Sequence, residues 1–191
     1  AQIKKGNRKS ELALREAEVW SSLALPQGYQ YPYAQMDKTW KLLLLQQFHD
    51  ILPGSSIERV NTEAHAHFAQ ILEEACAATG QALDALMQPG KGAMVFNSLS
   101  FPREEVVLLP KAFKQGAATR DGELLKTQQT RDGLLALVPM PSMGAIGLQP
   151  VKEAPAFEGV KARVTASGAS LENEHIKVKL NKRGEVTSFF D

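Results

Sequence analysis

The chain is organised around one stretch, Trp40-Lys41-Leu42-Leu43-Leu44-Leu45-Gln46-Gln47-Phe48-His49-Asp50-Ile51-Leu52-Pro53-Gly54-Ser55-Ser56. It begins as an apolar run at helical spacing, and Leu42 and Leu45 extend the apolar character around the helix. We expect a helix of this kind to be buried on all sides. Pro53-Gly54 ends it, because proline lacks an amide donor and clashes with the preceding turn. His49 and Asp50 are therefore predicted at the last helical turn or just beyond it, at the end of a buried rod.

Helical patterns lie on both sides of this stretch. A small and apolar stripe predicts a first helix over about residues 8–25, with residues 4–7 as a tail before it, and a second helix over about residues 34–48. Ser55-Ser56-Ile57-Glu58 fits a capping box for a third helix that continues to about Met87. Its small and apolar residues recur at steps of three and four, at Ile57, Val60, Ala64, Phe68, Ile71, Ala75, Ala78, Ala82 and Leu86. Gly80 allows a bend, Pro89-Gly90 is expected to end the helix, and the three helices predict an up-down-up bundle.

Strand patterns follow residue 92. Strand-like runs cover residues 93–97, 105–109, 124–128, 134–138 and 143–151, with turn signals at Asp121-Gly122 and Asp132-Gly133 and a loop over 153–160. Residues 176–180 alternate apolar side chains with lysine, and the turn at 181–184 leads into 185–190, which predicts a hairpin. The predicted fold class is therefore α+β. A three-helix bundle over residues 1–90 precedes an antiparallel β-sandwich-like domain over residues 91–191, which we expect to be incomplete at its C-terminus.

The composition argues against several classes of protein. The net charge is +1 with both signs interspersed, so no nucleic-acid partner is expected. No apolar run approaches the roughly 18–20 residues that span a bilayer, so no membrane partner is expected either. Cys76 is the only cysteine, which permits no internal disulfide and fits a reducing compartment, and we expect it to be half-buried on a helix. Formation of an oligomer stays open.

The histidines and tyrosines are the side chains most able to carry chemistry. His65 and His67 lie two apart on a helix and point roughly 200° apart, so they cannot hold one metal ion together. His175 beside Glu174 fits a surface role. His49 beside Asp50 fits either a histidine that stabilises a helix C-terminus or a metal ligand. Catalytic zinc requires three or more protein ligands, so any metal site at this pair must be completed from outside the segment.

An aromatic connector joins the first two predicted helices. Tyr29, Tyr31 and Tyr33 alternate there, and their rings fit either stacking on a sugar or a packed loop that covers the helix ends.

Gln47-Phe48-His49-Asp50-Ile51-Leu52-Pro53-Gly54-Ser55-Ser56 resembles the motif at the active-site end of the helical middle domain in α-mannosidases of glycoside hydrolase family 38. The resemblance is to the cytosolic and bacterial branch, because the Golgi and lysosomal branch tends to have a second histidine where this chain has Phe48. Three more stretches match in the same order, over residues 4–18, 95–103 and 171–191. The likeness covers nearly the whole chain and is weakest over residues 111–161.

The resemblance implies a zinc-dependent retaining exo-α-mannosidase of the cytoplasm that acts on terminal α-mannosides of oligosaccharides. It implies that His49 is one zinc ligand and that Asp50 hydrogen-bonds hydroxyls of the mannose. The other zinc ligands, the nucleophile and the acid/base are implied to belong to an N-terminal α/β barrel of the same polypeptide, so this segment holds no catalytic residue. We expect the chain alone to be inactive and to bind zinc weakly.

Two other readings use the same residues. The chain could be a non-catalytic carbohydrate-binding or interaction module, with the three tyrosines and the β domain as its surface. It could also be a purely structural helical adaptor, in which His49 and Asp50 are exposed and replaceable without effect.

Overall fold

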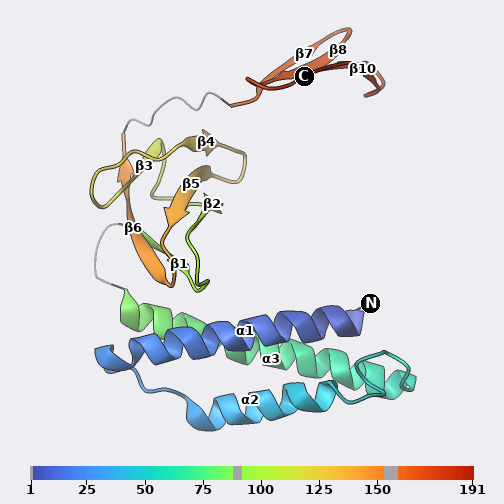
Figure 1. Ribbon diagram of the computed structural model, residues 1–191, viewed down its shortest axis with the longest axis vertical. Helices are drawn as coiled ribbons and strands as arrows, with labels where there is room; N and C mark the ends of the chain where they lie inside the picture. The colour runs from blue at the N-terminus through green and yellow to red at the C-terminus, as the bar shows by residue number, and fades with distance from the viewer. Residues whose placement is uncertain (1, 88–91, 153–158) are drawn as a thin grey trace. The chain divides into compact units, whose positions relative to one another are not determined.

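The computed structural model describes residues 2–87, 92–152 and 159–191 (Figure 1). These residues divide into two compact units. The first combines the described part of Ala1–Gly90 with Phe96–Phe101 and Ser142–Gly144, and the second contains the remaining β structure. The predicted loop over 153–160 lies mostly outside the described residues, as do Pro89-Gly90 and the predicted domain boundary, which stays a prediction.

The first unit is the predicted up-down-up bundle. Its helices are α1 (Gln2–Ala24), α2 (Tyr33–Gln46) and α3 (Glu58–Leu86), with a 3₁₀ turn, η1 (Leu25–Gln27), after α1. Figure 1 shows α2 running opposite to α1 and α3. No described helix is long and apolar enough to cross a membrane.

The α1–α3 interface is built from small side chains around a few large ones. Six of the predicted seam residues of α3 are buried, namely Ala64, Phe68, Ile71, Ala75, Ala78 and Ala82. Facing them, α1 buries Ile3, Asn7, Ser10, Leu14, Ala17, Trp20, Ser21 and Ala24. The predicted tail over residues 4–7 was wrong, because this part of α1 packs on α3. A Cβ on Gly6 would lie only 2.6 Å from Cδ2 of Phe68, so the lack of a side chain permits this close approach.

The second helix is not buried on all sides, which corrects the first expectation. Its buried residues are Met36, Thr39, Leu43 and Gln46, whereas Leu44 and Leu45 are 58% and 55% exposed. The reason is that α2 lies on one side of the α1–α3 pair and packs mainly against α3. Its exposed leucines therefore belong to the face that points away from the bundle.

Two details of α3 differ from the predictions, namely its N-cap and the exposure of Cys76. The capping box is absent, because the helix begins at Glu58 with Ile57 as N-cap and no side-chain cap. Instead, the Asn61 side chain donates to the carbonyl of Ser56 over 2.8 Å. The helix continues through Gly80 without a break. Cys76 is on the helix as predicted but exposed, since the buried stripe passes through its neighbour Ala75.

The second unit contains antiparallel sheets. The strands are β1 (Ala93–Asn97), β2 (Arg103–Leu108), β3 (Gly116–Thr119), β4 (Thr127–Gln129), β5 (Leu134–Met140), β6 (Gly144–Val151), β7 (Lys161–Thr165), β8 (Gly168–Glu172), β9 (Lys177–Asn181) and β10 (Val186–Phe190). They form sheets of order β1-β6-β3, β2-β5-β4 and β10-β9-β8-β7. The first two sheets share one core, to which β5 contributes Leu134, Ala136, Val138 and Met140 from one face. This arrangement confirms the α+β class and the sandwich-like packing.

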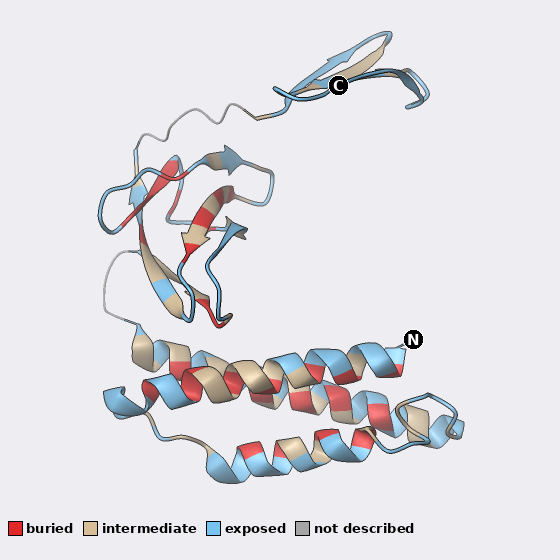
Figure 2. Ribbon diagram, viewed as in Figure 1, coloured by how far each residue is buried: buried red, intermediate tan, exposed pale blue. Residues whose placement is uncertain are grey.

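The third sheet includes the predicted hairpin, formed by β9 and β10. Its register places eight apolar residues on one face: Ala162, Val164, Ala169, Leu171, Val178, Leu180, Val186 and Phe189. The opposite face is polar apart from Phe190, which pairs with Lys177, and it includes a 2.8 Å ion pair between Lys177 and Glu172. No residue of these strands is buried (Figure 2), and Val164 and Phe189 are 86% and 63% exposed.

Candidate functional site

The His49–Asp50 pair lies in the turn between α2 and α3, at the end of the bundle where α1 begins (Figure 1). Short-range backbone hydrogen bonds shape this turn. The amides of Ile51 and Leu52 donate to the carbonyl of Phe48 over 2.9 and 3.0 Å, and Gly54 closes the turn with a φ of 77°. The sequence folds this way because Pro53 cannot continue a helix and glycine tolerates the left-handed conformation. The prediction that the pair follows the last turn of the second helix is confirmed.

Both side chains of the pair are open to solvent. His49 is 76% and Asp50 65% exposed, and Nε2 of His49 lies 3.4 Å from Oδ2 of Asp50. The Phe48 ring lies beside the imidazole, with 4.2 Å between ring centroids. Neither side chain is sealed inside the bundle, so the imidazole of His49 and the carboxylate of Asp50 remain accessible to a metal ion or another ligand. Among the residues that the structure describes, no group of three or more His, Cys, Asp or Glu side chains could hold a metal ion.

Side-chain hydrogen bonds hold the last turn of α2 against the other two helices. Gln47 donates from Nε2 to Oε1 of Glu11 on α1 over 3.0 Å. Gln46 is 1% exposed, and its Nε2 lies 3.1 Å from Nδ1 of His67 on α3. Beyond the pair, Ile51 is half-buried against the bundle core. No local sequence pattern indicates these two hydrogen bonds, because each joins residues more than 20 positions apart.

Two further hydrogen bonds fix α2 along its length. Trp40 donates from Nε1 to Oε1 of Glu18 over 3.0 Å. Thr39 donates from its buried hydroxyl to Oε2 of Glu74 over 2.5 Å, and this bond holds the pKa of the Glu74 carboxyl below its usual value. The helix that leads to His49 is therefore tied to both α1 and α3.

The remaining histidines do not form a site within the described residues. His65 is exposed on α3, and His67 faces Gln46, so the two do not converge. His175 is 73% exposed and lies 3.3 Å from the carboxylate of Glu174, which confirms its surface position.

The three tyrosines mostly serve packing. The Tyr29 hydroxyl donates to the carbonyl of Ala78 over 3.4 Å, and Tyr31 packs against the bundle core. Burial is the main cause that raises the pKa of the Tyr31 hydroxyl. Only Tyr33 is largely exposed, at 73%, with its ring 4.4 Å from that of Tyr31. This geometry favours the packed-loop reading over a sugar-stacking surface.

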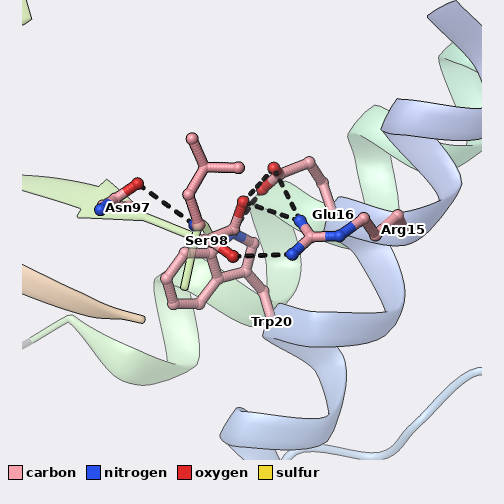
Figure 3. Close-up of polar contacts among 6 residues, drawn as sticks. Arg15, Glu16, Trp20, Asn97 and Ser98 are labelled. Atoms are coloured by element: carbon pink, nitrogen blue, oxygen red, sulfur yellow. Dashed lines mark hydrogen bonds and ion pairs between the residues drawn. The ribbon is translucent and has the colours of Figure 1, made fainter. Parts of the chain in front are cut away.

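A polar cluster on α1 was missed by the sequence analysis (Figure 3). Arg15 donates from Nη1 to Oγ of Ser98 over 3.1 Å and from Nη2 to its carbonyl over 2.9 Å. The Ser98 hydroxyl donates to Glu16, which also accepts from Nε1 of Trp20 over 2.9 Å. The Trp20 ring makes an edge contact with Phe96. Through these contacts, residues 96–101 pack with α1 and belong to the first unit. Arg15 and Ser98 are 83 positions apart, so no local sequence pattern indicated their contact.

Comparisons with known proteins agree with this arrangement. The family described as alpha mannosidase middle domain matches residues 1–86, which carry the three helices and the His49–Asp50 turn. The chain is 38% identical to human Alpha-mannosidase 2C1 over 200 residues, and the match covers 98% of the chain. The mouse protein of the same name is 37% identical over the same length. The chain belongs to glycoside hydrolase family 38.

The solved structures that resemble this family 38 chain show its fold. A glycosyl hydrolase family 38 protein from Enterococcus faecalis matches 97% of the chain with a TM-score of 0.67 and 20% identity. An alpha-mannosidase from Enterococcus faecalis V583 matches with a TM-score of 0.64 and 19% identity. The chain spans 17% of the length of the human relative and 28% of each of these structures, so most of each relative lies outside the match.

Proposed function

We propose that this chain is a segment of a zinc-dependent, retaining exo-α-mannosidase that hydrolyses terminal α-mannosides of oligosaccharides. In this proposal His49 supplies one zinc ligand and Asp50 hydrogen-bonds hydroxyls of the mannose. The remaining zinc ligands, the nucleophile and the acid/base come from an N-terminal α/β barrel of the same polypeptide. The observation that carries the proposal is the exposed His49–Asp50 pair, which offers two donors at the end of a bundle that matches the α-mannosidase middle domain.

The donor set of this segment fits zinc only in part. A neutral imidazole and a carboxylate are both zinc donors, but a catalytic site requires three or more protein ligands. The described residues do not complete such a set, which supports a site shared with another domain. Zinc bound there would chelate adjacent hydroxyls of the sugar and favour a distorted ring, while two carboxylates carry out the double displacement. The role of this chain is to hold the imidazole and the Asp50 carboxylate where that site forms.

Two measurements on the isolated chain test this division of labour. Incubation with an aryl α-mannoside should give no turnover, because the segment lacks the nucleophile. Titration with zinc should give no submicromolar binding that depends on His49. Turnover, or tight zinc binding that is lost in His49→Ala, would contradict the proposal that another domain completes the site.

We also propose a cytoplasmic location for the enzyme. The support is the resemblance of residues 47–56 to the cytosolic and bacterial branch, together with a single cysteine that is exposed and unpaired. Fractionation of cells that express the complete polypeptide would test it, and secretion into the medium is the contrary result.

A further inference from the structure

We infer that Gln47 and Glu11 are positioning residues for the His49–Asp50 pair, so that α1 controls the placement of groups carried by the turn after α2. This inference rests on the proposed function of the pair. Among the described residues, few side-chain contacts hold the turn after α2 against the other helices.

The pair itself has no fixed attachment to the bundle. Within the described part of the chain, the side chains of Phe48, His49 and Asp50 contact one another but form no hydrogen bond or ion pair with another element. Their positions therefore depend on the residues that flank them. The nearest flanking contacts are the Gln47–Glu11 hydrogen bond before the pair and the half-buried Ile51 after it, while Asn61 of α3 holds the far end of the turn at the Ser56 carbonyl.

The Gln47–Glu11 hydrogen bond is suited to positioning rather than to overall stability. The body of α2 is already held by the buried Met36 and Leu43 and by the hydrogen bond from Trp40 to Glu18. Gln47 follows the last residue of α2, and only Phe48 separates it from His49. Its hydrogen bond to Glu11 is therefore the last hydrogen bond to α1 before the pair. The acceptor is a carboxylate, and hydrogen bonds to an ionised acceptor are on average stronger than those between neutral groups.

A second hydrogen bond stops the same segment from rotating about the first. Gln46 is buried and reaches Nδ1 of His67 on α3 over 3.1 Å, while its Nε2 also donates to the carbonyl of Leu42 over 3.2 Å. Two neighbouring glutamines thus connect the end of α2 to two different helices. Catalytic groups must be held to within a fraction of an ångström, and a displacement of about 1 Å costs on the order of 100-fold in rate.

The test measures backbone order in the 191-residue chain by NMR relaxation, which does not depend on any enzyme activity. We expect order parameters of about 0.85 at residues 48–50 in the parent chain and below about 0.6 in Gln47→Ala and Glu11→Ala. Glu11→Gln retains a carbonyl acceptor and should keep the parent values. Arg8→Ala is the matched control, because it removes only the exposed 3.2 Å ion pair of Glu11. The thermal midpoint of the bundle should stay the same in all four variants.

Several results would overturn the inference. These are a disordered turn in the parent chain, unchanged order parameters in Gln47→Ala, or an equal loss in Arg8→Ala. A midpoint that falls together with the order parameters in Gln47→Ala and Glu11→Ala would show a general structural role instead.

A second arm separates this inference from the proposed function. In the complete polypeptide, Gln47→Ala should raise the zinc dissociation constant or lower kcat/KM by about 10–100-fold, because a displacement of about 1 Å at a functional group can cost on the order of 100-fold. If His49→Ala leaves zinc content and activity unchanged, the proposed function fails. If His49→Ala abolishes zinc binding but Gln47→Ala has no effect on order or affinity, only the positioning role fails.

Discussion

Replacing Gly6 with alanine should destabilise the helical bundle, although alanine is the better helix former. A Cβ at this position would lie 2.6 Å from Cδ2 and 2.8 Å from Cγ of Phe68, well inside van der Waals contact. Phe68 is 3% exposed and is part of the core, so its ring cannot move into solvent. Either the ring or α1 must shift, and overpacking of this kind costs about 1–3 kcal/mol.

Gly80→Ala is the matched control for this substitution. Gly80 is also helical, but a Cβ there would meet nothing within 4 Å. Both substitutions gain up to about 1 kcal/mol of helix propensity. The difference between the two changes in free energy of unfolding therefore measures the contact with Phe68 and should be about 1–3 kcal/mol. For a helical unit of this size, that corresponds to a difference of at least about 4 °C in the thermal midpoint followed by circular dichroism at 222 nm.

A smaller side chain on α3 should relieve the clash. In a Phe68→Leu background, the cost of Gly6→Ala should fall, which gives a coupling energy between the two positions. The reasoning is refuted if Gly6→Ala stabilises the bundle as much as Gly80→Ala does, or if the two positions show no coupling.

Three other perturbations test separate contacts. Arg15→Ala removes both hydrogen bonds to Ser98 and should raise the rate of amide hydrogen exchange over residues 96–101 by about tenfold, which corresponds to about 1.4 kcal/mol. Arg59→Ala is the control, because it breaks only an exposed ion pair with Glu63 and should leave these exchange rates unchanged. Thr39→Val should lower stability at pH 7 by about 1 kcal/mol. The pKa of Glu74 is lowered from 4.5 in the folded state, chiefly by the Thr39 hydroxyl, so this stability is fully present above pH 4.5 and is lost as the pH falls through the lowered pKa. Urea unfolding at several pH values should therefore show a parent chain that loses more stability in acid than Thr39→Val does, and parallel curves would contradict this. In the complete enzyme, His49→Ala should mainly lower zinc content and Asp50→Ala should mainly lower kcat/KM, and identical effects on both quantities would exclude the separate roles.

The regular helices could be predicted because their patterns are local. The small and apolar steps of α3 marked six residues that are indeed buried, and the second helix ends at Gln46, two residues before its predicted end and just before His49 and Asp50. The start of α1 could not be predicted in this way. Two lysines and a glycine are typical of a tail, whereas in the folded bundle Gly6 packs against Phe68, 62 positions later, within a helix that buries Ile3 and Asn7 on either side of it.

Strands with weak local preference were missed for a related reason. Gly116–Thr119 has the sequence Gly-Ala-Ala-Thr, and Gly168–Glu172 is also poor in β-branched and aromatic residues. They become strands because they pair with β6 and with β7 and β9, and such pairing overrides a weak intrinsic preference. The same limit applies to the candidate site. The sequence indicated His49 and Asp50, whereas Glu11 and Gln47, 36 positions apart, become neighbours only in the folded bundle.

The one-sided sheet of β7–β10 has a practical consequence for every solution experiment above. Its apolar face presents Val164, Val186 and Phe189 to water at 86%, 62% and 63% exposure. At high concentration such faces favour association between copies of the chain, and association slows the molecular tumbling that relaxation measurements depend on. Relaxation and unfolding measurements therefore belong in dilute samples or in a Val164→Lys background, which places a charge on that face at the edge strand β7.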